Sequence, residues 1–407
     1  MDVLPGRFGR VKVVTGPVKS DKERIIQISL DRLVGSGFNT NGFLGEGKVL
    51  VARHPKDDNL PETIGKHNVL VTDSVPEIYS KIRESTGIVF MVGASHYGQD
   101  AVDLTDSLTR SNRRAIVSGL NLDASGEPHG VMPQLIGLAD DIELAKAVCN
   151  KTKYTICTKK QANRSMLESD GKDTRYIPVC HHHFHFPDLP RTANGASFTL
   201  RTGEMFSGKT VKCEGDVAKI LKTIGEERVA MFKWINDQRY GQEGGKKVYD
   251  FDDITLNDGR RLGGAVLVRN TEDMAQYLAE HPEKREVYFS EVQFFPGIFN
   301  LVSELLSKGY HLQADGLLRT ADRKVFGETA MLACLADKVD ITHAICGQCY
   351  SQATESQELA LTSGETRTKT VNVGGSDLYE ARCLSCLEYA VVENPFELKS
   401  FDIKNLK

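Results

Sequence analysis

The feature that most constrains this chain is an internal repeat whose period is close to half its length. The strand-like run VKVVT precedes Gly16, and a second such run, SFTLRT, precedes Gly203, which lies 187 residues later. Further on, SGL at 118–120 corresponds to DGL at 315–317, an offset of 197. Offsets that increase slowly while the order of motifs is kept indicate a tandem duplication with small insertions. The chain is therefore expected to fold as two similar domains.

The length of 407 residues agrees with this expectation, because domains commonly have about 100 to 200 residues. The stretch FPDLPRTANGA at 186–196 has no periodicity and contains two prolines and an Asn-Gly pair, which are signals for turns and linkers. We predict a degenerate first domain at 1–185, a linker at 186–196, a second domain at 197–392 and a tail at 393–407.

Composition narrows the function. A net charge of −4 with interspersed signs offers no excess positive field for nucleic-acid phosphates, so a polymeric nucleic acid is not expected as a partner. No run of 18 apolar residues occurs, and the N-terminal MDVLPGRFGR lacks the apolar core of a signal peptide. We therefore expect a cytoplasmic protein that does not bind membranes.

The second half contains a phosphate-binding loop of the pattern G-x-x-x-x-G-K-[ST]. A strand-like run precedes it and the helix-compatible stretch VKCEGDVAKILKTI follows it, which is the context that this motif needs. Backbone N–H groups would surround the phosphates, Lys209 would contact the β/γ oxygens, and the Thr210 hydroxyl would bind Mg²⁺. The loop consists of Gly203, Glu204, Met205, Phe206, Ser207, Gly208, Lys209 and Thr210.

The corresponding loop of the first half, at 16–23, is degenerate. Asp21 replaces the second glycine and Glu23 replaces the Mg²⁺-binding hydroxyl, so two carboxylates would face the phosphates. Like-charge repulsion and the loss of a residue suited to positive φ both oppose nucleotide binding. We predict that the first half does not use ATP.

Glu291 is the candidate general base of the second half. It follows the apolar run Val287–Phe289 at the expected carboxyl end of a strand, opposite the phosphate loop. The first half has VGAS at 92–95 where the second has SEVQ at 290–293, so it also lacks this carboxylate. Its strand-like runs remain, with a stretch predicted to be helical, LADDIELAKAV at 138–148.

Two C-x-x-C pairs predict a structural Zn²⁺ site, because four thiolates leave no open coordination position. The ligands are Cys346, Cys349, Cys383 and Cys386. The first half keeps a C-x-x-H pair at 180–183, and its preceding cysteine could be Cys149 or Cys157, so a second site stays open.

Together, GEMFSGKT, EVQFFP, GLLRTADRKVFG and the two C-x-x-C pairs flanking GGSDLY resemble the type II thymidine kinases, over most of the second half and weakly over the first. The resemblance implies a parallel α/β sheet of the P-loop NTPase type with flanking helices, present twice, and a small zinc-bound lasso subdomain in the second copy. It also implies that Glu291 deprotonates the 5′-hydroxyl of thymidine or deoxyuridine, which attacks the γ-phosphoryl group of Mg²⁺-bound ATP.

The same resemblance implies further site residues. Asp237 and Arg239 match a segment near the phosphates. The thymidine pocket would be formed by Phe294, Leu317, Thr320 and Phe326, and the lasso would contribute Val373, Gly374 and Tyr379.

Two positions depart from the family pattern. Ser290 stands where the family has an aspartate that helps to hold Mg²⁺, with Asp237 a candidate to compensate, and Ala321 stands where many relatives have phenylalanine. These departures keep two alternatives open, a kinase for another pyrimidine nucleoside and a nucleotide-binding regulator without turnover. Because these kinases form tetramers, the first half could act as a built-in partner subunit.

Overall fold

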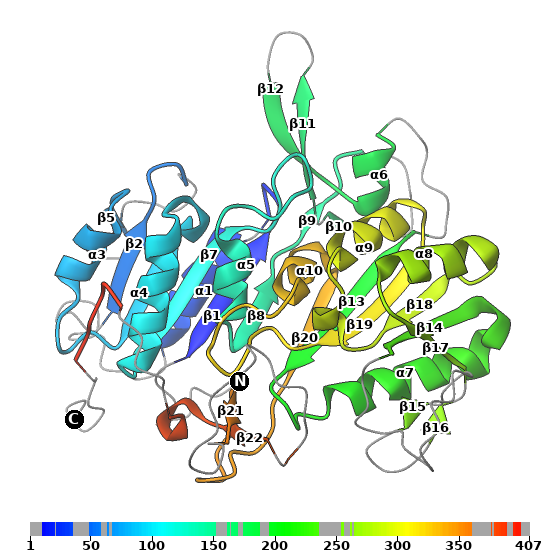
Figure 1. The fold of residues 1–407 in the computed structure, drawn as a ribbon. Helices are drawn as coiled ribbons and strands as arrows, with labels where there is room; N and C mark the ends of the chain where they lie inside the picture. Colours follow the sequence, from blue (N-terminus) through cyan, green and yellow to red (C-terminus); the bar gives the residue numbers. More distant parts are fainter. Residues whose placement is uncertain are drawn as a thin grey trace. The chain divides into compact units, whose positions relative to one another are not determined.

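A computed structural model describes residues 10–20, 22–35, 49–57, 63–64, 67–151, 161–162, 164–169, 174–187, 195–235, 254–255, 261–262, 264–359, 376, 378–388 and 394–399. The chain divides into two compact units. The first comprises 1–180 together with 390–407, and the second comprises 181–389. Figure 1 shows the chain coloured from its N-terminus to its C-terminus.

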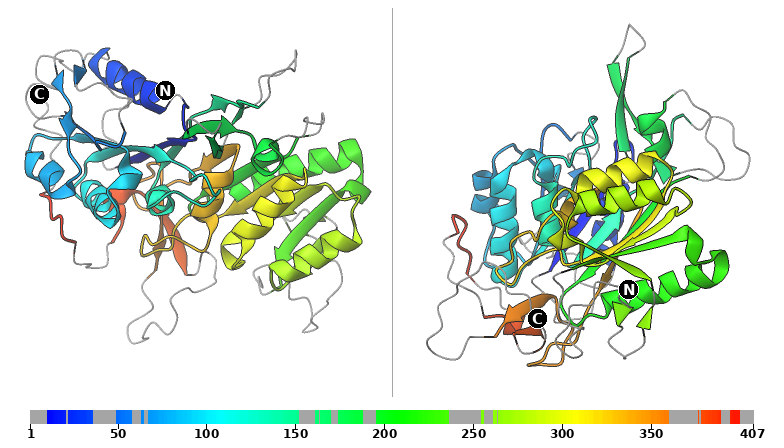
Figure 2. Two further views of the ribbon diagram at one scale, coloured as in Figure 1. Left: turned by 90° about the horizontal axis from the view of Figure 1, so that it is seen from above. Right: turned by 45° about the vertical axis from the view of Figure 1, so that its right-hand side comes forward.

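The first unit is built on a six-stranded parallel sheet in the order β5-β2-β6-β7-β1-β8. Helix α1 covers one face of this sheet, and α3 and α4 cover the other (Figure 2). The strands are β1 (Val11–Gly16), β2 (Val49–Arg53), β5 (Leu70–Val71), β6 (Ile88–Val92), β7 (Arg114–Leu120) and β8 (Asp141–Leu144). The helices are α1 (Lys22–Gly35), α3 (Val75–Lys81), α4 (Gln99–Arg110) and α5 (Met132–Gly137).

The second unit repeats this plan with a parallel sheet in the order β17-β14-β18-β19-β13-β20. Helix α7 lies on one face, and α8 and α9 lie on the other (Figure 2, right). The strands are β13 (Ser197–Gly203), β14 (Val229–Trp234), β17 (Ala265–Val268), β18 (Glu286–Phe289), β19 (His311–Gly316) and β20 (Lys338–Thr342). The helices are α7 (Lys209–Ile224), α8 (Thr271–Glu280), α9 (Ile298–Ser307) and α10 (Thr329–Leu335). The predicted α/β fold in two copies is confirmed.

Shorter elements complete both units. Two-stranded antiparallel pairs are β3 (Thr63–Ile64) with β4 (His67–Asn68), β9 (Ala147–Val148) with β10 (Gln161–Ala162), β11 (Arg164–Ser169) with β12 (Thr174–Val179), β15 (Ile254–Thr255) with β16 (Arg261–Leu262), and β21 (Glu355–Glu358) with β22 (Tyr379–Arg382). Short helices are α6 (His181–His185) and the 3₁₀ turns η1 (Ala94–His96), η2 (Glu226–Arg228), η3 (Val292–Phe294) and η4 (Leu384–Cys386).

The sheets form because their central strands are apolar on both faces, as parallel strands covered by helices must be. Every residue of β6 is buried, for example. In the second unit, the amphipathic helix α7 turns Cys213 and Val217 onto Met231 and Tyr288 of the sheet. None of the helices within the described ranges is long and apolar enough to span a bilayer.

The predicted helix at 138–148 is wrong. This stretch follows the end of α5 and forms β8 and β9. Residues 141–144 pair with Lys12–Thr15 of β1, and the Asp140 carboxylate accepts a 2.9 Å hydrogen bond from the Val11 N–H. These pairings with a distant strand outweigh a weak local preference for helix.

The residues that follow the second unit belong to the first unit. Phe396 is buried there, with its ring 5.4 Å from that of Tyr79 in α3. The Tyr79 hydroxyl donates to the Glu397 carbonyl at 2.7 Å, and the Asn394 side chain donates to the Asp103 carbonyl in α4 at 3.2 Å. The part of the predicted tail at 394–399 is thus a packed segment of the first unit.

Candidate active site

The phosphate loop joins the end of β13 to the start of α7, as predicted. A side chain at Gly203 would collide with the carbonyl oxygen of Thr342, so only glycine lets β20 lie this close to the loop. Gly208 precedes α7 with φ of 76°, a left-handed conformation that glycine adopts without strain. Lys209 and Thr210 therefore begin a helix whose free N–H groups face the loop, which is the geometry of an anion site.

Residues from the segment 342–356 hydrogen-bond to the phosphate loop. The Glu204 carboxylate accepts the Ala344 N–H, the Met205 N–H donates to the Ser356 hydroxyl at 3.0 Å, and the Ser207 hydroxyl lies 3.0 Å from that of Thr342. Phe206 is half exposed with φ of 65°, and Lys209 is buried. The eight predicted loop residues thus run continuously from the last residue of β13 into the first turn of α7.

Glu291 lies two residues after the last residue of β18, at the strand end where it was predicted. It is buried and adopts a left-handed backbone with φ of 55°, an uncommon and strained state for a non-glycine residue. The Gln293 side-chain amide donates to Glu291 Oε2 at 2.5 Å, while Gln293 Oε1 accepts the Leu317 N–H at 3.1 Å. Gln293 therefore orients the carboxylate and ties it to the end of β19.

Asp315, which the sequence interpretation did not assign, lies on the strand between Glu291 and the phosphate loop. Its strand, β19, pairs with β18 on one side and β13 on the other. Asp315 is fully buried, and its Oδ1 accepts the Glu291 N–H at 2.8 Å. Burial and the Glu291 charge raise the pKa of Asp315 to about 6, against the opposing effects of Lys209 and the Thr210 hydroxyl. The DGL motif was the available signal, but its position beside the loop depends on strand order.

Aromatic side chains line the place predicted for the nucleoside base. Trp234, at the end of β14, stacks on Phe294 with ring centroids 4.5 Å apart, and Phe326 contacts Phe294 edge-on at 5.6 Å. Leu317 follows β19 directly, and Thr320 and Phe326 lie in the hairpin after it, where the Phe326 N–H donates to the Leu318 carbonyl at 3.0 Å. Trp234 was missed because no motif contains it.

Several predicted site residues cannot be placed with the others. Asp237 and Arg239 lie outside the described residues, as do Val373 and Gly374 of the predicted lasso. Tyr379 is described and begins β22, where it pairs with Glu358 of β21.

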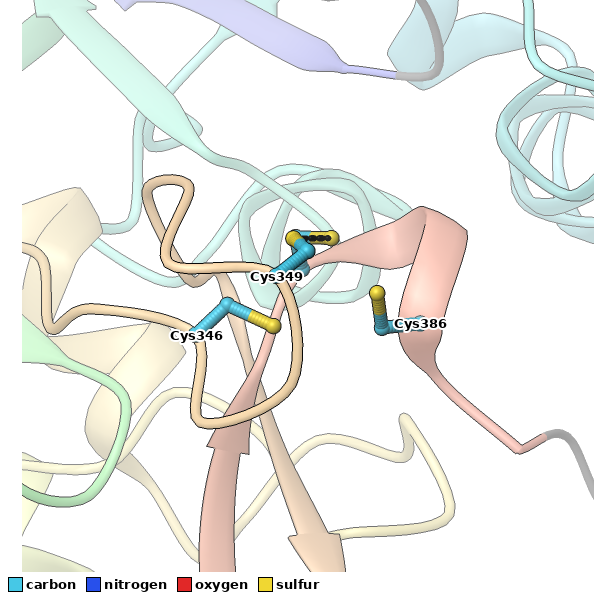
Figure 3. A group of neighbouring side chains, drawn as sticks. Cys346, Cys349 and Cys386 are labelled. Atoms are coloured by element: carbon cyan, nitrogen blue, oxygen red, sulfur yellow. Dashed lines mark hydrogen bonds between the residues drawn. The ribbon is translucent and has the colours of Figure 1, made fainter.

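The four predicted zinc ligands come together, each with its sulfur within 4.8 Å of the others. The Cys349 and Cys383 sulfurs are 3.5 Å apart, and Figure 3 shows Cys346, Cys349 and Cys386 turned toward one another. Hydrogen bonds from Ser351 lower the pKa of the Cys349 thiol to about 6, which favours the thiolate that binds metal. This donor set fits a closed tetrahedral Zn²⁺ site.

A comparison with models of known protein families shows to which family this chain belongs. The model of the thymidine kinase family matches residues 44–184 and 196–387, which together exceed half of the chain. The chain belongs to the thymidine kinase family. Two matches in tandem confirm the duplication inferred from the repeat, and membership identifies the protein as a nucleoside kinase.

The first thymidine kinase copy differs from the second at the phosphate loop and at the position of Glu291. Its family match begins at residue 44, beyond the degenerate loop at 16–23. Lys22, at the position of Lys209, is buried and donates to the Pro17 carbonyl at 2.8 Å and to the Ser20 hydroxyl at 3.1 Å. Gly93 occupies the position of Glu291, with φ of 71°. In this copy the lysine contacts its own loop, and no carboxylate occupies the position of Glu291.

The aromatic cluster of this kinase has also changed in the first copy. Strand registers place His54 at the position of Trp234, His96 at that of Phe294 and His129 at that of Phe326. The three imidazoles keep similar contacts, with centroids 5.1 Å apart for His54 and His96 and 5.3 Å for His96 and His129.

The first copy also brings two of its candidate metal-binding cysteines together. Cys149 and Cys180 are both buried, and their sulfurs lie within 4.8 Å of each other, whereas the alternative Cys157 lies outside the described residues.

Proposed function

We propose that the protein transfers the γ-phosphoryl group of ATP to the 5′-hydroxyl of thymidine, and of deoxyuridine, giving the 5′-monophosphate for nucleotide salvage in the cytoplasm. The observation that supports this proposal is the position of Glu291 at the same edge of the sheet as the phosphate loop. Strands β18, β19 and β13 are neighbours, so their carboxyl ends bring a carboxylate base and an anion site to one edge of the sheet. Family membership supports the nucleoside as acceptor.

Each group at the site has its own role in the proposed reaction. The 5′-oxygen of the nucleoside forms a bond to the γ-phosphorus, the bond from that phosphorus to the bridging oxygen breaks, and ADP leaves. Glu291 takes the hydroxyl proton, and Gln293 keeps its carboxylate oriented through the 2.5 Å hydrogen bond. Lys209 and the N–H groups of the loop stabilise negative charge on the transferred group. The Thr210 hydroxyl would hold Mg²⁺, which neutralises phosphate charge when ATP is bound.

The pocket chemistry supports a flat pyrimidine base. Trp234, Phe294 and Phe326 offer ring faces and edges, which suit stacking against an aromatic heterocycle. Backbone groups of the predicted lasso, around Val373 and Gly374, would read the polar edge of the base, and Tyr379 would contact the sugar. Asp237 and Arg239 would contribute near the phosphates.

One catalytic centre per chain follows from the differences between the copies. The first copy has Gly93 in place of the base and Glu23 in place of the metal-binding hydroxyl. We therefore assign the first unit a supporting role, as an internal partner for the second.

A matched pair of lysine substitutions tests the proposal in the full chain. Lys209→Met should abolish transfer of labelled phosphate from ATP to thymidine, while Lys22→Met, at the corresponding position of the first copy, should leave kcat within about twofold of the unmodified protein. Loss of activity in both variants would refute the assignment to one centre. An unmodified protein that binds ATP but phosphorylates no nucleoside would instead favour a regulatory role.

A further inference from the structure

We propose that Asp315 binds the Mg²⁺ ion that accompanies ATP, supplying the carboxylate that this chain lacks at Ser290. The inference rests on the proposed function, because it concerns the same phosphate site. P-loop proteins hold Mg²⁺ with the loop Ser or Thr and an aspartate at the end of a neighbouring strand. In the second unit, Ser290 follows β18, and Asp315 lies near the end of β19, the strand between β18 and the loop strand β13.

The two carboxylate oxygens of Asp315 differ in their hydrogen bonding. Oδ1 accepts the Glu291 N–H at 2.8 Å. Oδ2 is buried and has no hydrogen-bond partner among the described residues. Because a buried carboxylate oxygen without a donor or cation is costly, such an atom indicates a missing positive ligand.

The groups that interact with Asp315 identify the ligand as a hard divalent cation at the phosphates. Helix α7, which begins with Lys209 and Thr210 of the phosphate loop, packs against β19, the strand that carries Asp315. Oxygen ligands from a hydroxyl and a carboxylate, completed by phosphate oxygens, form the set that Mg²⁺ prefers.

The first copy provides an internal comparison that separates this role from a role in folding. Ser118 occupies the position of Asp315 there, and it is equally buried in a sheet with the same strand order. The sheet therefore accommodates a small neutral side chain at this position. The carboxylate is absent from the copy whose loop also lacks a metal-binding hydroxyl at Glu23, so the two oxygen ligands were lost together.

Binding of Mn²⁺ together with a non-hydrolysable ATP analogue, measured by electron paramagnetic resonance, tests the proposal without turnover. Asp315→Asn should weaken Mn²⁺ binding about 10-fold or more, the effect expected when a metal contact is lost. The double variant Ser290→Asp/Asp315→Asn should regain most of this affinity, because it returns a carboxylate to the adjacent strand end. Asp315→Ser copies the first unit and serves if the asparagine variant folds poorly.

Two controls make the outcomes distinct. Thymidine affinity, followed by the fluorescence of Trp234, the only tryptophan in the chain, should change less than about twofold in Asp315→Asn. Ser118→Asp in the first copy should create no new Mn²⁺ site. Unchanged Mn²⁺ affinity in Asp315→Asn, or a loss that Ser290→Asp does not restore, would overturn the proposal. If the unmodified protein binds the metal–nucleotide complex but phosphorylates no nucleoside, the proposed function fails and this inference survives.

Discussion

Glu291 and Gly93 occupy the same left-handed backbone position in the two copies, with φ of 55° and 71°. In both copies the residue precedes a 3₁₀ turn at the end of a buried strand. Glycine adopts it without strain, whereas a residue with a Cβ loses stability there. The second copy thus keeps a strained glutamate where the first copy has the residue that best fits the backbone.

Because of this relationship, two substitutions of Glu291 should abolish activity equally but differ in stability. Glu291→Gly and Glu291→Ala should both abolish phosphoryl transfer, because each removes the base. The glycine variant should be more stable than the alanine variant by about 1 kcal/mol, since only alanine retains the left-handed strain. Urea unfolding of the two variants measures the difference, and an alanine variant at least as stable as the glycine variant would contradict the strain argument.

The imidazole cluster of the first unit should make that unit sensitive to acid. Burial lowers the pKa of His54, His96 and His129 below 6.5. Nearby charges modify this, with Lys56 lowering the pKa of His54 and His96, and Asp57, Asp73 and Asp123 acting in the opposite direction. Because the unfolded chain binds more protons, the stability contribution is complete above pH 6.5 and is lost as pH falls through the lower folded pKa values.

Hydrogen exchange of the full chain at several pH values measures this loss. Amides of β2, β6 and β7 should exchange faster as pH falls below about 6.5, after correction for intrinsic rates, relative to those of β14, β18 and β19. The variant His54→Phe/His96→Phe/His129→Phe, which approximates the second unit, should lose this dependence. Persistence of the same acid sensitivity in that variant would assign it to other groups.

A zinc ion held by the four-cysteine cluster should support ATP binding as well as the segment that carries the cysteines. The segment that carries Cys346 and Cys349 also supplies Thr342, Ala344 and Ser356, which bond to the phosphate loop. Metal binding stabilises such a segment, so its removal frees the supports of the loop. Cys349→Ser should lower zinc content, measured by mass spectrometry, and raise the KM for ATP several-fold.

Cys334→Ala is the control for that experiment, because Cys334 is buried in α10 outside the cysteine cluster. It should leave zinc content unchanged. If Cys349→Ser loses zinc while the KM for ATP stays the same, the loop does not depend on the metal-bound segment.

The C-terminal segment should stabilise the first unit. Phe396 is buried against Tyr79, so Phe396→Ala should reduce the free energy of unfolding of that unit by about 3 kcal/mol. Exchange of α3 and α4 amides measures the effect. Glu397→Ala keeps the backbone carbonyl that Tyr79 bonds and should have little effect; equal losses in both variants would show that packing of Phe396 is not the cause.

The sequence by itself determined the features that are written locally. The repeat, the phosphate loop at 203–210, the strand end at Glu291 and the paired cysteines are patterns of neighbouring residues, and each corresponds to one turn, strand end or chelating pair. Comparison of the two copies also showed which one keeps the second glycine, the hydroxyl and the carboxylate at these positions, because the differences are visible residue by residue.

Tertiary structure decided what depends on strands far apart in the chain. Asp315 reaches Glu291 and the loop because β19 lies between β18 and β13, and Trp234 meets Phe294 through the register of β14 with β18. The stretch at 141–144 forms a strand because it pairs with the edge of β1. Local periodicity cannot encode such pairings, since their energy comes from contacts between residues that only the folded sheet brings together.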